Sequence, residues 1–429
     1  MEKQKKNLGS VAFLPLIVFL VCYVGCGITF TLMGADDPFG KFPRHVALLA
    51  GCAVALLLNR SMDVKDKLNI MTTNMGNSGV MMIVLIYLMA GGFQGAAAAM
   101  GGKDSVVNLC LHVIPVTFLI PGVFLMCCFI STSIGTSMGT IAAMAPIAIN
   151  VAQGAHLNVA IVGAAVIGGS YFGDNLSMIS DTTISAAEGC GSEMNFFIAL
   201  PAAIVAMILY SVVGGTGSGA IKAGSYNIIE VLPYLIVLGA ALMGINVAVV
   251  LFVGILSAGI IGLCVGSCGF FDWIQAIGNG MSDMFSISMV AILVSGIIGI
   301  VREYGGVEWL VGAISGKIKN RRGAEYGIGL MSGILSAAMV NNTIAIIVTC
   351  PIAKEIGEKY KIAPKRLASL VDIFACAFIS LMPHDGGMLM ITALADVSPL
   401  NVLKYSFYMF GLIIATCVTI QFGLMDEKN

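Results

Sequence analysis

Apolar runs long enough to cross a lipid bilayer recur along this chain, and they constrain its fold more than any other feature. A spanning helix needs about 20 residues, and the clearest runs cover residues 11–33, 79–100, 194–214 and 402–425. Hydrophobic residues make up 58% of the chain and charged residues only 10%, whereas a soluble domain has about a quarter charged residues. We therefore predict an all-α integral membrane protein.

The same succession of motifs occurs twice, about 200 residues apart. The first copy reads Gly76-Asn77, Gly101-Gly102, TIAAMAPIA from Thr140 and YFGDNLS from Tyr171. The second reads Gly278-Asn279, Gly305-Gly306, TIAIIVTCPIA from Thr343 and LMPHDGG from Leu381. Four matches in one order with nearly constant spacing are not easily accidental. They predict two structural repeats, residues 1–215 and 216–429.

Each repeat is expected to contain five spans and one interrupted, re-entrant hairpin, which gives about 10 transmembrane helices in the whole chain. An odd number of crossings per unit places the second unit upside down relative to the first. The polar tract at residues 215–227 would link them. The predicted hairpins are residues 107–151 and 326–356, and the predicted broken helices are residues 157–188 and 367–395.

The placement of basic residues predicts the orientation, because lysine and arginine collect in cytoplasmic loops. Basic residues lie on both sides of the second hairpin, whereas Lys103 alone lies beside the first. We expect a bacterial inner (plasma) membrane protein with both termini cytoplasmic. The residues that define the inner face are Lys3, Lys5, Lys6, Arg60, Lys65, Lys67, Lys317, Lys319, Arg321, Arg322, Lys359, Lys361, Lys365 and Arg366.

The two hairpin tips are rich in hydroxyl and amide groups. Backbone without helical hydrogen bonds is tolerated at membrane depth only where it is buried in protein or lines an aqueous cavity. Oxygen atoms suit sodium, but the same side chains can donate to a carboxylate, so the charge of the substrate stays open. Ordinary polar contacts between helices are the alternative. The candidate residues are Ser133, Thr136, Ser137, Asn341, Asn342 and Thr343.

Two aspartates, Asp174 and Asp181, interrupt an apolar stretch in the first repeat. Seven residues correspond to about two helical turns, so the two carboxylates would share a face if the helix continued. An ionisable residue at this depth costs about 2.5–3.5 kcal/mol and marks an ion pathway or a proton relay. We therefore predict that a cation lies between or beside them.

The second repeat has the acidic turn PHDGG, which begins at Pro383. Proline stops the helix, and the glycines permit positive φ. Asp385 falls where the repeat places Asp174, so we assign it to the same ion site. His384 titrates near neutral pH in its unperturbed state, and it is either a proton carrier or a structural hydrogen-bonding residue. The position of Asp372, within the membrane or at its cytoplasmic edge, stays open.

The sequence FGDNLSMISDTT resembles the GD[KN]xSPxSDTT signature of the NhaC-type sodium/proton antiporters, within the superfamily of inverted-repeat ion transporters; Met178 stands where a proline is common. The resemblance covers nearly the whole chain in topology and about a dozen residues in the motif. It implies Na⁺/H⁺ exchange, with Na⁺ at Asp174 and Asp181. Residue by residue it also assigns Asn175, Ser177, Ser180 and Thr182 to the ion site. The same family includes malate/lactate exchangers, and superfamily relatives carry dicarboxylates on Asn-Thr tips similar to Asn342-Thr343.

The favoured interpretation is a Na⁺/H⁺ antiporter whose buried aspartates bind Na⁺ when ionised and H⁺ otherwise, by alternating access. The alternative is a Na⁺-coupled transporter of a small organic solute, an amino acid or a carboxylate, held by the hairpin tips. Arg302 and Lys354 lie near the ends of spans, and this shortage of basic groups disfavours a multiply charged anion.

Other classes lack their motifs. The chain has no GxxxxGK[ST] nucleotide loop, no TVGYG filter and no GxSxG elbow, so an ATP-driven pump, a potassium channel and an enzyme are disfavoured. We expect no cofactor. No basic stripe with interleaved aromatic residues suggests nucleic-acid binding. The expected partners are Na⁺, H⁺, the lipid bilayer and, under the alternative interpretation, a small organic solute. The choice between a monomer and a homodimer stays open.

Overall fold

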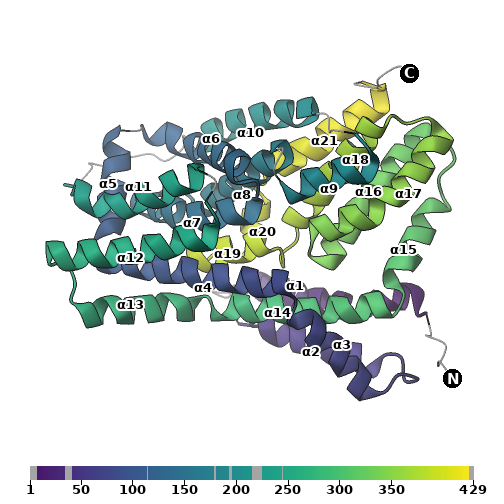
Figure 1. Cartoon of the computed structure of the whole chain (residues 1–429), viewed down its shortest axis with the longest axis horizontal. Helices are drawn as coiled ribbons and strands as arrows, with labels where there is room; N and C mark the ends of the chain where they lie inside the picture. Colours follow the sequence, from purple (N-terminus) through teal and green to yellow (C-terminus); the bar gives the residue numbers. More distant parts are fainter. Residues whose placement is uncertain are drawn as a thin grey trace.

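The computed structural model describes residues 7–33, 41–113, 115–177, 180–192, 196–214, 225–243 and 245–424. Every element in these residues is helical (Figure 1), which confirms the predicted all-α class. Five helical stretches have the length and apolar composition that crossing a membrane requires: Gly9–Phe30, Ser78–Ala99, Val159–Cys190, Val247–Val265 and Phe270–Glu303. The third of these stretches contains a break.

The order of helices in the first half of the chain recurs in the second. The first half contains η1 (Gly9–Phe13), α1 (Leu14–Leu32), α2 (Arg44–Leu57), α3 (Val64–Met75), α4 (Ser78–Ala99), α5 (Gly102–Val113), α6 (Val116–Ile134), α7 (Ser137–Gly154), α8 (Val159–Leu176), α9 (Asp181–Cys190), η2 (Phe196–Ile198) and α10 (Ala199–Gly214).

The second half contains α11 (Ile228–Leu242), α12 (Val247–Val265), α13 (Phe270–Asp283), α14 (Phe285–Glu303), α15 (Gly306–Ser315), α16 (Arg321–Met339), α17 (Asn342–Tyr360), α18 (Pro364–Ser380), α19 (Gly386–Ala395), α20 (Pro399–Leu403) and α21 (Phe407–Phe422). From α1 and α11 onward, the elements of the two halves correspond one to one.

Corresponding joints also share their backbone conformation. Gly101, between α4 and α5, has φ of +84°, and Gly305, between α14 and α15, has φ of +75°. The turn between α6 and α7 contains Gly135 at φ of +73°, and the turn between α16 and α17 contains Val340 at φ of +49°. Glycine adopts this left-handed conformation readily, whereas a β-branched residue there is an outlier. The tip of the second hairpin is therefore strained.

One of the four matched motifs does not mark equivalent positions. Gly76 ends α3 and Asn77 caps α4, whereas Gly278 and Asn279 lie inside α13. The predicted equivalence of the two Gly-Asn pairs is therefore wrong. The Asn77 side chain accepts a hydrogen bond from the first turn of α4, but at Asn279 the chain stays helical and the next helix begins only at residue 285.

The two halves are interleaved. Helix α4 packs against α12 and α13 of the other half, and α14 packs against α2 and α3. Figure 1 shows α4 running alongside α12 and the nearly collinear pair α13 and α14. The closest approach uses glycine, because a Cβ added at Gly280 would lie 2.1 Å from the carbonyl oxygen of Gly91. Small residues of this kind let helices approach closely in lipid.

The helices that follow the two breaks also cross between the halves. Helix α9 packs against α17 and α18, and α19 packs against α7 and α8. The acidic segment of each half therefore lies on the helices that form the hairpin and broken helix of the other half. This crossing determines which side chains meet.

A matched pair of buried hydrogen bonds attaches each hairpin to its broken helix. The hydroxyl of Ser131 in α6 donates to the carbonyl of Ser170 in α8, and the hydroxyl of Ser332 in α16 donates to the carbonyl of Val371 in α18. Both bonds join residues 39 positions apart. The hairpin and the broken helix of each half are thus fixed to one another at equivalent points.

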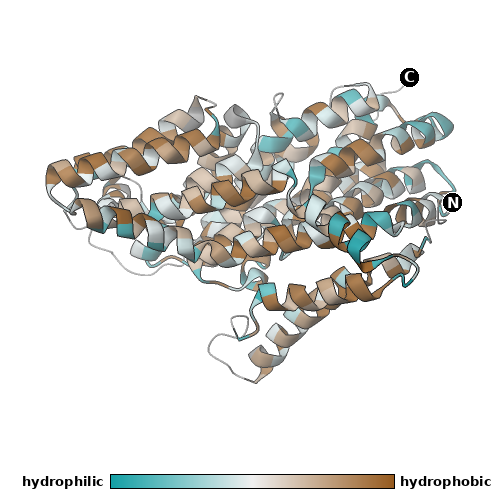
Figure 2. Ribbon diagram, turned by 60° about the horizontal axis from the view of Figure 1, so that its bottom comes forward, coloured by the Kyte–Doolittle hydropathy of each residue, from teal (hydrophilic) through white to brown (hydrophobic). Residues whose placement is uncertain are grey.

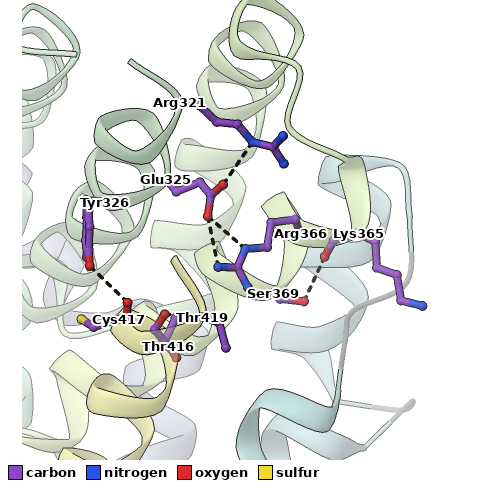
Figure 3. Close-up of polar contacts among 9 residues, drawn as sticks. All are labelled: Arg321, Glu325, Tyr326, Lys365, Arg366, Ser369, Thr416, Cys417 and Thr419. Carbon is purple, nitrogen blue, oxygen red and sulfur yellow. Dashed lines mark hydrogen bonds and ion pairs between the residues drawn. The ribbon is translucent and has the colours of Figure 1, made fainter. Parts of the chain in front are cut away.

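The second half adds a buried ion pair between α16 and α18 (Figure 3). The Nε and Nη2 atoms of Arg366 donate to Oε2 of Glu325 at 3.1 and 3.0 Å, and both side chains are almost fully buried. Nε of the half-exposed Arg321 lies 3.5 Å from the other carboxylate oxygen. The charges therefore hold the two helices together near their first turns.

The outer surface suits a lipid environment. Apolar residues cover the sides of the helices, while hydrophilic residues concentrate at their ends (Figure 2). Leu32, Ile260 and Ile414 are each more than half exposed, as expected where lipid replaces water. The basic segments 317–322 and 359–366 join α15 to α16 and α17 to α18, at the end of the molecule where η1 begins and α21 ends (Figure 1).

Candidate functional site

The first acidic segment leaves the helix between α8 and α9. Asp174 lies in the last turn of α8 and is 2% exposed. The hydroxyl of Ser180 donates to its Oδ1 atom, and the hydroxyl of Thr183 donates to its carbonyl oxygen at 3.2 Å. The hydroxyl of Ser137, from α7, is another hydrogen-bonding neighbour of the carboxylate. The carboxylate is therefore surrounded by hydroxyl groups from two helices and the break.

Asp181 is the first residue of α9, on the far side of the break, and it is exposed. The helix does not continue between the two aspartates, so they do not share one helical face, but Asp181 is still an electrostatic neighbour of Asp174. Its Oδ2 atom accepts a hydrogen bond of 2.7 Å from the hydroxyl of Thr343. A hairpin-tip residue of the second half therefore contacts the acidic segment of the first.

Asp372 joins the same group from the opposite half. It lies in the middle of α18, it is 0% exposed, and the carboxylates of Asp174 and Asp181 are its main electrostatic neighbours. The thiol of Cys376 lies 3.9 Å from Oδ1, and Oδ2 has no hydrogen-bond partner among the described residues. Asp174, Asp181 and Asp372 are called the acidic cluster below.

The acidic cluster has no basic counterpart in the described part of the chain. None of its three carboxylates forms an ion pair with lysine or arginine there. Like charges in a low-dielectric interior repel each other strongly, and a buried charge without a partner is not stable. Protons or bound cations at the cluster would relieve this repulsion.

Asp385 belongs to a neighbouring polar group. It caps α19, where Oδ2 accepts from the backbone N–H of Met388 and Oδ1 accepts from the hydroxyl of Tyr171, both at 3.1 Å. Tyr171 also lies within electrostatic range of Asp174. Tyr171 therefore links Asp385 to the acidic cluster.

The predicted equivalence of Asp385 and Asp174 is wrong. Asp174 precedes the break in its half, whereas Asp385 follows the break and caps the next helix. Helices α9 and α19 are equivalent and each has ten residues. The N-cap of α19 is Asp385 and the N-cap of α9 is Ser180, so Ser180 is the counterpart of Asp385 in the first half. The two acidic turns are similar in composition, but their aspartates lie on opposite sides of the helix break.

The other residues predicted at the ion site differ in their surroundings. Asn175 is buried beside the hydroxyl of Tyr408, and its amide has no hydrogen-bond partner in the described residues. The hydroxyl of Ser177 donates to the carbonyl of Thr132 at 2.8 Å. Thr182 neighbours Asp372. Met178 lies outside the described residues.

The predicted tip residues lie in the turn between α16 and α17 and in the turn between α6 and α7. Asn341 caps α17 through a bond of 2.8 Å from the N–H of Ile344, and Asn342 lies 3.5 Å from the sulfur of Cys376. Thr136 caps α7 without a side-chain hydrogen bond, and the side chain of Ser133 lies outside the described set. His384 is buried with Nε2 3.1 Å from the carbonyl of Ala337.

Sequence reasoning missed a partly buried basic residue in the first turn of α2. Nη1 of Arg44 donates to the hydroxyl of Thr392 in α19 at 3.1 Å. The next residue, His45, contacts Ser286, which lies about midway along the continuous apolar stretch from 270 to 303. Arg44 therefore lies beside the middle of that stretch. No local signal marks it, because the sequence around it reads as the end of a loop.

An apolar helical chain whose helices break at buried carboxylates has the organisation of a secondary transporter. The sequence profile of the Na⁺/H⁺ antiporter family matches residues 44–215 and 216–426. The chain belongs to this family, so it is a multi-pass membrane protein of a family of antiporters.

Curated relatives are similar over part of their length. The chain is 26% identical over 285 residues to the Na(+)/H(+) antiporter NhaC of Bacillus subtilis, which covers 61% of this chain and 60% of that protein. It is 25% identical over 217 residues to the Malate-2H(+)/Na(+)-lactate antiporter of the same organism, covering 49% and 45%. The chain thus matches about half of the length of these relatives.

Among solved structures, the chain is similar to the YdaH transporter of Alcanivorax borkumensis. The TM-score is 0.42 at 11% identity, over 86% of this chain and 90% of that chain. A likeness this weak carries no weight for the fold or the function.

Proposed function

We propose that this protein is a Na⁺/H⁺ antiporter that exchanges sodium for protons at the acidic cluster. The observation that carries the proposal is the burial of Asp174 and Asp372 beside Asp181 without a basic counterpart in the described residues. Such a group is stable when it holds a cation or protons, and it loses one as it gains the other. Exchange follows from that competition.

The oxygen atoms around Asp174 and Asp181 support sodium as the cation. Hard cations prefer oxygen ligands, and the hydroxyls of Ser180 and Ser137 and the carbonyl of Asp174 lie on one side, with Thr343 on the other. These groups come from both halves of the chain. A movement of one half against the other would therefore open and close the site.

The recurring order of helices supports the two proposed repeats, residues 1–215 and 216–429. We propose that they have opposite orientations and supply about 10 spans and two re-entrant hairpins, built from α6–α7 and α16–α17. The basic segments, the start of η1 and the end of α21 occupy one end of the molecule, which supports a cytoplasmic location for both ends of the chain in a bacterial inner membrane.

The test uses purified protein in proteoliposomes that contain a pH-sensitive dye. Addition of Na⁺ alone should move protons, and Asp174→Asn should abolish this movement while the protein stays folded. Asp396→Asn is the matched control, because Asp396 is exposed and has φ of +51°, a conformation that asparagine also adopts. Wild-type rates in Asp174→Asn would remove this residue from the site and contradict the proposal.

Arg44 favours a second candidate function, Na⁺-coupled transport of an organic carboxylate. A partly buried guanidinium beside α19 could pair with a substrate carboxylate. It donates to the hydroxyl of Thr392 and forms no ion pair in the described part of the chain. The name of the malate/lactate relative supports the same class. In the same liposomes, dependence of proton movement on lactate or malate, lost in Arg44→Gln, would support this function.

A further inference from the structure

We propose that Cys190 and Cys350 are an oxidisable pair, whose reversible disulfide joins the two halves of the chain and stops transport. The sulfur atoms of these two free cysteines lie 3.5 Å apart in the interior of the protein. Cys190 ends α9 in the first half, and Cys350 lies in α17 of the second half. The effect on transport rests on the proposed function, whereas the formation of the disulfide does not.

The two sulfur atoms need little movement to form a bond. A disulfide bond is about 2.05 Å long, so the atoms must approach each other by about 1.5 Å from their separation of 3.5 Å. Gly189 lets the helices come this close, because a Cβ at that position would lie 2.7 Å from both Cβ and Sγ of Cys350. The side chain of Cys350 therefore packs directly on the backbone of α9, next to Cys190.

The surroundings of the pair are those of reactive cysteines. The side chain of Lys354 is an electrostatic neighbour of both sulfur atoms, and its Nζ atom lies 3.6 Å from the position of a Cβ at Gly191. Cysteines react in electropositive surroundings that a reagent can reach. Both cysteines are buried, but Gly191, the next residue after Cys190, is exposed. The pair therefore lies just below the surface, where a molecule as small as hydrogen peroxide can reach it.

Hydrogen peroxide is the oxidant that we assign to this reaction. One sulfur attacks an oxygen atom of the peroxide, so that an S–O bond forms, the O–O bond breaks and a water molecule leaves with the thiol proton. The second sulfur then attacks the first, so that an S–S bond forms, the S–O bond breaks and a second water molecule leaves. The thiols lose two electrons, and the peroxide is reduced to two water molecules. A thiol reductant reverses the change by disulfide exchange.

A bond at this point joins two helices that also meet at the proposed ion site. Asp181 begins α9 and accepts a hydrogen bond from Thr343 in the first turn of α17. The cysteine pair lies further along both helices, so α9 and α17 pack side by side and run in the same direction. A hydrogen bond breaks when one half moves against the other, but a covalent bond does not. The disulfide therefore holds the site in one state.

The experiment detects the bond and its effect on transport separately. A protease site is inserted in the polar tract 215–227, and the purified protein in proteoliposomes is treated with hydrogen peroxide. After proteolysis, the two fragments should migrate together in a denaturing gel without reductant and separately with dithiothreitol. Proton movement driven by Na⁺ should fall to the background of empty liposomes in the oxidised protein, and dithiothreitol should restore it.

Three variants assign the effect to the pair. Cys190→Ser and Cys350→Ser each remove one of the two sulfur atoms, so their fragments should stay separate after peroxide treatment and their proton movement should persist. Cys264→Ser is the matched control, because Cys264 is exposed in α12. This variant should respond to peroxide as the wild type does. The wild-type gel and its reversal by dithiothreitol do not depend on the folding of any variant.

Each other outcome overturns the proposal. Separate fragments from the oxidised wild type mean that no bond joins the halves, and linked fragments with unchanged proton movement mean that the bond locks nothing. Loss of proton movement in oxidised Cys190→Ser places the relevant oxidation elsewhere. If the reduced wild type moves no protons with Na⁺, the proposed function fails. In that case linked fragments and a higher unfolding temperature of the oxidised protein still support the joining of the halves, and their absence refutes it.

Discussion

Removal of one charge from the buried pair in Figure 3 should destabilise the protein by an amount that depends on which charge is removed. Glu325→Gln leaves the guanidinium of Arg366 buried, with 3% of its side chain exposed, and without the carboxylate it contacts at 3.0 Å. Breaking a buried pair in this way costs about 3–5 kcal/mol. We therefore expect a loss in that range for Glu325→Gln.

Arg366→Met should cost less, because Glu325 keeps Arg321 at 3.5 Å. Arg321 is 42% exposed, and an exposed pair contributes about 0.2–1 kcal/mol, so the difference between the two variants should be of the order of 1 kcal/mol. The double variant Glu325→Leu/Arg366→Met removes both charges. It should recover most of the stability, because well-packed apolar residues often replace a buried pair without loss.

The assay is thermal unfolding of the detergent-purified protein, followed by the reaction of a thiol-specific dye with cysteines that are buried in the native state, such as Cys127 and Cys376. Glu325→Gln should unfold at the lowest temperature, Arg366→Met at a higher one, and the double variant nearest to the wild type. Arg321→Met is the control and should change little. If Glu325→Gln and the wild type unfold together, the pair contributes nothing and the reasoning is refuted.

Two further substitutions test the packing between the halves and the tip of the second hairpin. Gly280→Ala should destabilise the protein by about 1–3 kcal/mol, as overpacking does, because the added Cβ would lie 2.1 Å from a carbonyl oxygen of α4. Gly278→Ala is the control, because a Cβ at that position meets no neighbouring atom within 4 Å. It should be neutral or stabilising in the same unfolding assay. Thr343→Val should raise the Na⁺ concentration for half-maximal transport about tenfold, since a hydrogen bond to a charged group contributes about 1.5–3 kcal/mol and its hydroxyl donates to Asp181 at 2.7 Å. Thr349→Val, which removes a hydroxyl bonded within the same helix, should not change that concentration, and equal Na⁺ dependence in both variants would contradict a role for the tip.

Features that depend on neighbouring residues in the sequence were predictable. The apolar runs predicted helices because each span must satisfy its own backbone hydrogen bonds in lipid. Gly101 and Gly305 marked the same joint because each has positive φ, and an acidic residue in an apolar run marked the break after Asp174. These signals act within a few residues, so one sequence is enough to reveal them.

Contacts between distant helices were not predictable in the same way. Asp372 neighbours Asp174 because α8 of the first half packs against α18 of the second. Arg44 lies beside the middle of the apolar stretch 270–303 because α2 packs against α14, although the residues before it read as a loop. Hydropathy indicates whether a helix lies in the membrane, but it does not indicate which other helices pack against that helix.

The same limit explains why Asp385 was paired with the wrong residue, and it has a consequence for the ion site. A repeat preserves the course of the backbone and not the chemistry at each position. At the second break, Asp385 accepts hydrogen bonds from a backbone N–H and from the hydroxyl of Tyr171. The first break gathers three carboxylates and no cation in the described chain. One arrangement of helices is therefore used twice, and the proposed function assigns the exchanged ions to the carboxylates at the first break.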